Sequence, residues 1–161
     1  MVDVGEKPVT RRRARAICRL RMKPEILAQI LPSDDGEGVA RATGDAPSAF
    51  GKGDVLGVAR VAGIQASKDT SRLIPLCHPL GLDQVGIEFE LSSEDTLLVA
   101  AEVRLSARTG PEMEALVAVT VAALTVYDMC KAVDPDMVIE EARLDEKEGG
   151  KKGLYRHPRS R

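Results

Sequence analysis

The chain has 161 residues, which suits a single domain with a core of ordinary size. Aromatic residues make up 2% of it and tryptophan is absent, which argues against binding of nucleic acid by base stacking. A net charge of −2 argues against a general affinity for polyanions, so any phosphate site must come from local clustering of cations.

The N-terminal region and the cysteines favour a cytoplasmic protein without a membrane span. The arginines near the start are mixed with Asp3 and Glu6, which is not typical of a signal sequence. The longest apolar run is shorter than the about 20 residues that a bilayer requires. Cys18, Cys77 and Cys130 are widely spaced and form no C-x-x-C pair, so neither a disulfide framework nor a protein-borne metal site is predicted.

The first part of the chain predicts one strand and two helices. Alternating apolar and arginine residues indicate a half-buried strand over 15–22. Pro24 suits the first turn of a short helix over 25–31. Residues 32–51 are rich in Gly, Ala, Asp and Ser, and we interpret them as a long mobile loop. Helical spacing returns over 54–67, although its two glycines weaken that prediction unless close packing needs them.

The second part begins with a segment that cannot be a regular helix. Residues 73–82 contain two prolines, which remove helical hydrogen bonds. Apolar and charged residues then alternate over 84–91 and 97–105, which predicts a β-hairpin. A last strand is predicted over 137–144, and we interpret the charged, Gly-rich residues 145–161 as a flexible tail.

The longest apolar stretch, residues 110–133, predicts one helix. Pro111 suits its first position, and Glu112 and Glu114 fall where the helix dipole favours negative charge. Apolar residues then point in nearly every direction, so we expect packing on most sides. Asp128 lies near the other end, where a carboxylate opposes the dipole by about 0.3–1 kcal/mol. One unfavourable residue in an otherwise consistent element indicates a functional site.

The order strand, helices, strand, strand, helix, strand predicts the fold. It is the βαββαβ order of a ferredoxin-like α+β sandwich, with an antiparallel sheet and helices packed on one face. The first crossover contains an extra helical segment. No repeat or linker is visible, so residues 1–161 are expected to form one domain.

Two isolated residues are candidates for chemistry. Pro79 holds His78 on a stiffened backbone, which suits proton transfer or ligand orientation and equally a histidine hydrogen-bonded in the core. Lys52 stands between two glycines before a predicted helix, a place that favours phosphate, but the Ser or Thr of a P-loop is missing. Without further support, a solvated loop lysine is the simpler interpretation. Lys68 and Lys147 are cations that folding could gather around a polyphosphate.

Asp128 and Lys131 are neighbours on one helix surface because they are three residues apart. They form either a local ion pair worth about 0.2–0.5 kcal/mol or a coupled acid and base in a partly dry cleft. Glu114 lies fourteen residues earlier on nearly the same face, about 21 Å away. A small substrate cannot touch both ends in one chain, so the use of both ends requires two sites or one shared between subunits. We therefore expect a homo-oligomer.

Three segments closely resemble the MoaC family, the cyclic pyranopterin monophosphate synthases of molybdenum cofactor biosynthesis. They are MVDVGEKPVT, KDTSRLIPLCHPL and GPEMEALVAVTVAALTVYDMCKAVDPDMVI, and the resemblance runs from Met1 to about Tyr155. It implies a lyase that converts 3′,8-cyclo-7,8-dihydroguanosine 5′-triphosphate to cyclic pyranopterin monophosphate and releases pyrophosphate. It also implies a ferredoxin-like subunit in a hexamer, a trimer of dimers, with active sites at the dimer interface.

The resemblance assigns roles to residues of this chain. The implied catalytic residues are Asp128, Lys131, Lys52 and His78. The implied substrate contacts are Leu76, Cys77, His78, Met113, Glu114, Glu112, Lys68 and Lys147. Placed acids and bases would move protons during ring opening and closure, and lysines would stabilise the charge of the leaving pyrophosphate. No tightly bound cofactor is expected, and a Mg²⁺ ion accompanying the triphosphate or pyrophosphate is left open.

Two other function classes compete with the lyase. One is a non-catalytic ferredoxin-like nucleotide-binding regulatory module that holds a triphosphate without turnover. The other is a purely structural oligomerisation subunit, which leaves the LCHPL segment and the Gly-Lys-Gly lysine unexplained. The position of Asp128 favours the enzyme, because phosphate binding gains nothing from a carboxylate there.

Overall fold

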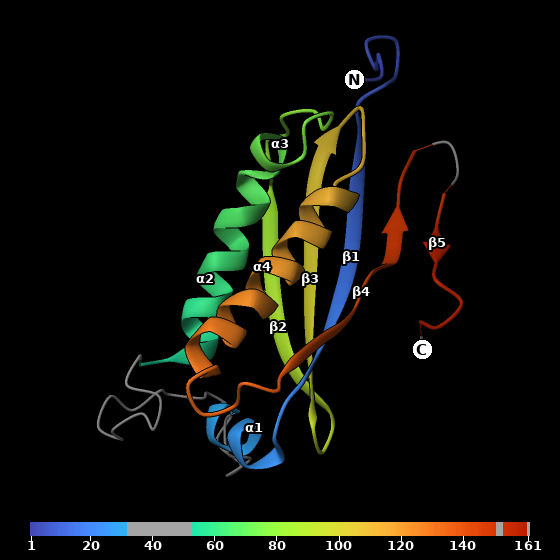
Figure 1. Ribbon diagram of the computed structural model, residues 1–161. Helices are drawn as coiled ribbons and strands as arrows, with labels where there is room; N and C mark the ends of the chain where they lie inside the picture. Colours follow the sequence, from blue (N-terminus) through green and yellow to red (C-terminus); the bar gives the residue numbers. More distant parts are fainter. Residues whose placement is uncertain (32–52, 151–152, 161) are drawn as a thin grey trace.

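The computed structural model describes residues 1–31, 53–150 and 153–160. Its elements are β1 (Thr10–Arg21), α1 (Pro24–Ile30), α2 (Val55–Lys68), α3 (Thr70–Leu73), β2 (Gln84–Ser93), β3 (Thr96–Ala107), α4 (Glu112–Cys130), β4 (Val138–Glu148) and β5 (Tyr155–Arg156). The strands form one antiparallel sheet, and α2 and α4 cover one of its faces (Figure 1). The loop predicted over 32–51 lies outside the described residues.

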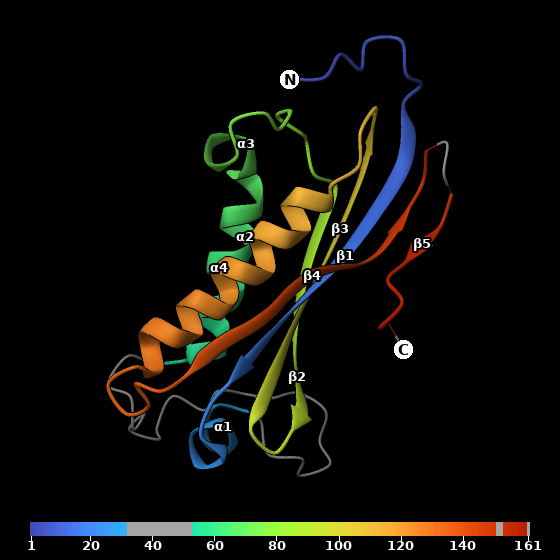
Figure 2. The ribbon, with the colours of Figure 1, turned by 45° about the vertical axis from the view of Figure 1, so that its right-hand side comes forward.

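The sheet topology confirms the predicted ferredoxin-like fold. The strand order is β2-β3-β1-β4-β5, and its first four members have the arrangement that a split βαβ unit produces. The central strand β1 pairs with β3 from Thr10 opposite Ala107 to Arg21 opposite Thr96. Figure 2 shows α4 lying diagonally across the sheet, with α2 on the same face. The opposite face of the sheet carries no helix in the described part of the chain.

Helix α2 begins at a side-chain cap and packs closely on α4. The Asp54 carboxylate accepts a hydrogen bond of 2.8 Å from the Gly57 N–H, which satisfies a donor at the helix start. Further along, a Cβ on Gly63 would meet the Ile87 side chain, and it would lie 2.8 Å from the carbonyl oxygen of Ala118 on α4. Close packing between the two helices therefore requires the glycine at this position.

Helix α4 is buried on one face rather than on most sides. Alanines and valines contact the sheet and α2: Ala115, Ala118, Val119, Ala122, Ala123 and Val126. On the outer face Leu124 is 51% exposed, because a single chain supplies no further layer there. The helix is long and apolar enough to cross a membrane, yet over half of it is buried within the fold, as in the core helix of a soluble protein.

The C-terminal region differs from the flexible tail predicted over 145–161. Strand β4 continues to Glu148, and Tyr155 and Arg156 pair with it as β5. The end of β4 is charged on both faces, so it lacks the apolar alternation that identifies a strand. Ion pairs to β1 replace that pattern, including Arg13 to Glu146 at 2.9 Å.

Gly63→Ala should lower the free energy of unfolding by about 1–2 kcal/mol. Overpacking costs about 1–3 kcal/mol, and the better helix propensity of alanine returns up to about 1 kcal/mol. The backbone carbonyl of Ala118 cannot rotate away from the new methyl group. Chemical denaturation measures the change. Gly86→Ala is the control, because nothing lies within 4 Å of its added Cβ. Equal stability of the two variants would contradict the close packing of α2 on α4.

Candidate functional site

Many of the predicted site residues converge on one pocket where α4 begins. The pocket has a volume of about 590 Å³, and its walls come from the N-terminal residues, the loop after α3, the start of α4 and the end of β4. Seven predicted residues line it: Leu76, Cys77, His78, Glu112, Met113, Glu114 and Lys147. The fold thus gathers groups from three separate parts of the chain.

The N-terminal residues form a wall of the pocket that local sequence patterns do not predict. The His78 ring nitrogen Nε2 lies 2.9 Å from the carbonyl oxygen of Val2, and Val2, Val4 and Lys7 line the pocket. This contact joins residues 76 positions apart, so no local periodicity could predict it. The only signal was the resemblance carried by the MVDVGEK segment. The contact joins the ring of His78 to the N-terminal residues, and both line the pocket.

An ion pair connects the start of α4 with the end of β4. The Lys147 ammonium lies 3.0 Å from Glu112 Oε1, and both side chains are partly buried. A second cleft of about 270 Å³ adjoins the pocket and shares Lys7, Gly110, Glu112 and Lys147 with it. Arg12 lines this basic cleft, and its guanidinium donates to the carbonyl oxygens of Ala107 at 3.0 Å and Arg108 at 3.1 Å. Its lining carries four cations, Lys7, Arg12, Arg13 and Lys147, against two carboxylates, Glu112 and Glu148, so the balance of charge favours anions.

Glu114 is a buried carboxyl at the floor of the pocket. Burial raises its pKa, and the nearby charge of Glu112 raises it further, against the effect of a backbone hydrogen bond. Burial also raises the pKa of the neighbouring Cys77 thiol, and the charge of Glu114 raises it further. A carboxyl with a raised pKa in a pocket can hold a proton at a pH where an exposed glutamate has lost it.

Asp128 and Lys131 lie at the opposite end of α4 from this pocket. The Lys131 ammonium is 2.7 Å from Asp128 Oδ1, and both side chains are more than half exposed. The hydrogen bond that the Lys131 ammonium donates to Asp128 raises the pKa of Lys131. The helix α4 runs between the two ends (Figure 1). At a rise of 1.5 Å per residue, the fourteen positions from Glu114 to Asp128 correspond to about 21 Å. Within one chain, the Asp128–Lys131 pair therefore does not reach the pocket at the start of α4.

The remaining predicted residues are not placed in the pocket. Lys68 is exposed at the last position of α2 and does not line either cavity. Lys52 lies outside the described residues. Within the described ranges, no three His, Cys, Asp or Glu side chains are grouped so that they could hold a metal ion.

The model of the MoaC family matches residues 1–150. This chain belongs to the MoaC family. Two relatives, from Mycobacterium tuberculosis (strain H37Rv) and Mycobacterium bovis, are each 54% identical over 156 residues, which cover 97% of this chain and 80% of the relative. Both are named cyclic pyranopterin monophosphate synthase 3. The pocket is built largely from segments that carried the MoaC resemblance.

Glu114→Gln should stabilise the fold at neutral pH and lose that advantage in acid. A raised pKa means that the folded state binds the proton more tightly, so stability falls as pH rises from the ordinary glutamate value of about 4.3 through the raised pKa. The amide of the variant does not ionise, so its stability does not fall in this pH range. The variant is therefore more stable than wild type only at pH values above the ordinary glutamate pKa. Denaturation from pH 3.5 to 8 measures the difference. Glu90→Gln, at an exposed position of β2, is the control. An identical pH profile for wild type and Glu114→Gln would contradict the burial effect.

Proposed function

We propose that this chain is a cyclic pyranopterin monophosphate synthase. The reaction converts 3′,8-cyclo-7,8-dihydroguanosine 5′-triphosphate to cyclic pyranopterin monophosphate with release of pyrophosphate, in molybdenum cofactor biosynthesis. The observation that carries the proposal is the convergence of the LCHP loop, the start of α4 and Lys147 on one pocket, in a chain that is 54% identical to relatives of that name.

The two adjoining cavities suit the two halves of such a substrate. The larger pocket has apolar walls from Leu76 and Leu144 and carboxyl groups at Glu112 and Glu114, which can accept hydrogen bonds from a guanine-like edge. The smaller cleft is lined by Lys7, Arg12 and Lys147 and suits the phosphates. Cations placed there would stabilise the charge that develops as pyrophosphate leaves.

The proton transfers are assigned to Asp128, Lys131, Lys52 and His78. Opening and closing rings on the guanine side requires groups that give and take protons at fixed positions. His78 is already held at the pocket, whereas Asp128 and Lys131 lie at the far end of α4. We propose that a second subunit brings its own Asp128 and Lys131 to this pocket, in a hexamer built as a trimer of dimers.

No tightly bound cofactor takes part in this proposal. A Mg²⁺ ion, where one takes part, would arrive with the triphosphate or pyrophosphate, whose oxygens are suitable ligands for it. The proposed location is the cytoplasm, because all three cysteines, Cys18, Cys77 and Cys130, are free thiols.

The first test of the proposal uses the cyclised GTP intermediate as substrate. Wild-type protein should release pyrophosphate and form a pterin chromophore, and Asp128→Asn should reduce the rate at least about 100-fold, because proton transfer is lost. Circular dichroism and size-exclusion chromatography should show unchanged fold and assembly. Glu88→Gln, an exposed change on β2, is the matched control with full activity. Tight binding of the intermediate without turnover would favour the regulatory module instead.

The second test asks whether subunits share a site. Lys147→Ala and Asp128→Ala should each lower the rate at least about 100-fold while leaving a measurable residual rate, and mixing them under conditions that exchange subunits should restore activity. With a two-fold dimer and random exchange, half of the dimers are mixed and each has one intact site, so about a quarter of the wild-type rate is expected. Lack of recovery in mixed oligomers verified by mass spectrometry would show that each site lies within one chain.

A further inference from the structure

Strand β4 carries a β-bulge beside the pocket, and Asp145 is its extra residue. In the pairing of β4 with β1, Glu146 lies opposite Arg15 and Leu144 lies opposite Ala16, so Asp145 has no opposing residue. Such a bulge adds one residue to one strand and changes the direction of the side chains that follow. Bulges of this kind are common beside active sites.

The bulge decides which way Lys147 points. Side chains of a regular strand alternate between faces, so residues three apart, such as Leu144 and Lys147, would lie on opposite faces. Here both line the larger pocket, and Lys147 reaches Glu112 on α4. The neighbouring Glu146 instead meets Arg13 on the face without helices. Without the extra residue, a regular strand would turn Lys147 away from the site.

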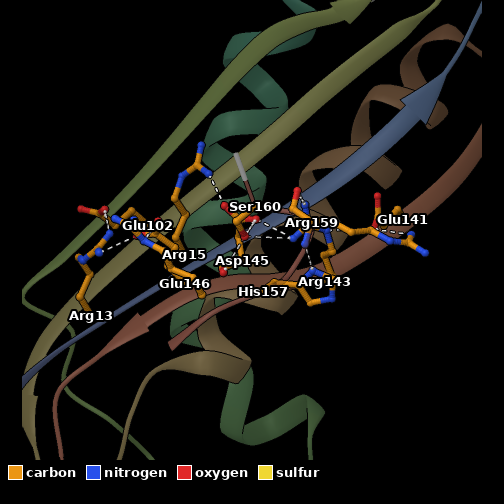
Figure 3. A network of polar contacts seen from close by, with 11 residues as sticks. Arg13, Arg15, Glu102, Glu141, Arg143, Asp145, Glu146, His157, Arg159 and Ser160 are labelled. Carbon is orange, nitrogen blue, oxygen red and sulfur yellow. Dashed lines mark hydrogen bonds and ion pairs between the residues drawn. The ribbon is translucent and has the colours of Figure 1, made fainter. Parts of the chain in front are cut away.

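The C-terminal segment, residues 153–160, holds this bulge in place. The backbone N–H of His157 donates to the Asp145 carbonyl oxygen at 2.8 Å. The Ser160 hydroxyl lies 3.0 Å from that oxygen and 2.6 Å from Asp145 Oδ1 (Figure 3). The carboxylate, which is almost fully buried, also accepts from Arg15 at 2.7 Å and Arg143 at 2.6 Å. Asp145 thus bonds to β1, β4 and the C-terminal segment.

The same segment also pairs directly with the strand that carries Lys147. Tyr155 lies opposite Lys147 and Arg156 opposite Glu146 in the β4–β5 pairing. Arg156 Nε is 2.9 Å from Glu146 Oε1. The match to the family model ends at residue 150, so these contacts come from a part of the chain beyond that match.

We propose that Asp145 is a positioning residue for Lys147, and that His157 and Ser160 hold it in that role. This inference rests on the proposed function, in which Lys147 contacts the phosphates. Loss of the Ser160 hydroxyl loosens the bulge, and the Lys147 ammonium is then no longer held at the junction of the two cavities. Asp145 and Ser160 do not touch the substrate.

The test compares Ser160→Ala, Ser160→Thr and Lys147→Ala, alone and combined. Ser160→Ala should lower kcat/KM about tenfold, because small displacements of a substrate-contacting group are costly, and Ser160→Thr should restore most of the rate by keeping the hydroxyl. In the Lys147→Ala background, Ser160→Ala should have no further effect, since both act through one ammonium group. Arg143 Nη1 donates to the Ser160 hydroxyl at 3.5 Å. Ser92→Ala is the matched control, because it also removes a serine hydroxyl that accepts from an arginine, Arg19 at 2.6 Å.

A second readout separates this proposal from the proposed function. The side-chain resonance of Lys147, assigned with Lys147→Arg, should shift in Ser160→Ala and stay unchanged in Ser92→Ala. If wild type releases no pyrophosphate, the proposed function fails, but the resonance still tests the positioning. An unmoved Lys147 resonance would overturn the inference, and so would independent, multiplicative losses in the Ser160→Ala, Lys147→Ala double variant.

Discussion

The close packing of α4 on the sheet and on α2 is the constraint from which the arrangement of the site follows. Small residues on one face of α4, together with Gly63 on α2, let the backbones approach until only a hydrogen fits at that glycine. The helix is therefore fixed in place against the sheet and α2. One end places Glu112 and Glu114 beside the His78 loop, and the other end carries Asp128. The packing fixes where the pocket lies, and the length of α4 sets its separation from Asp128.

On the face of the sheet without helices, ion pairs rather than apolar contacts connect the side chains of neighbouring strands. Arg13 and Arg15 of β1 reach acidic residues of β4 across the strands, and Arg13 bonds to Glu102 and Glu146 at 2.9 Å each. Isolated surface pairs contribute little, but here several share a partly buried network. Burial alone would raise the pKa of Asp145, yet hydrogen bonds from Ser160 and Arg15 lower it below the usual value. The ionised form therefore contributes stability at neutral pH, and that contribution is lost as pH falls through the lowered pKa.

Periodicity in the sequence predicted the elements that bury one apolar face, and it failed where charge decides the structure. The alternation over 84–91 and 97–105 and the helical spacing over 54–67 correspond to β2, β3 and α2. The end of β4 and the whole of β5 were missed, because ion pairs and backbone pairing hold them without an apolar pattern. In the site, the LCHP loop and the start of α4 were identified from their motifs. The part of the pocket wall formed by Val2 was not identified, because its contact with His78 depends on the completed fold.

The exposed end of α4 is where the proposed second subunit has a physical role. In one chain the Asp128–Lys131 pair is open to water, where solvent and salt screen its interaction and weaken its influence on proton affinity. Acid–base chemistry near neutral pH needs groups whose proton affinities are shifted by burial and by nearby charges. A second subunit that seats this pair against the pocket of the first would remove water from both carboxylate and ammonium. The same contact could also cover apolar residues such as Leu124, which the fold of one chain leaves exposed. Burial of that apolar surface would favour association, so assembly and activation of the acid would arise from one interface.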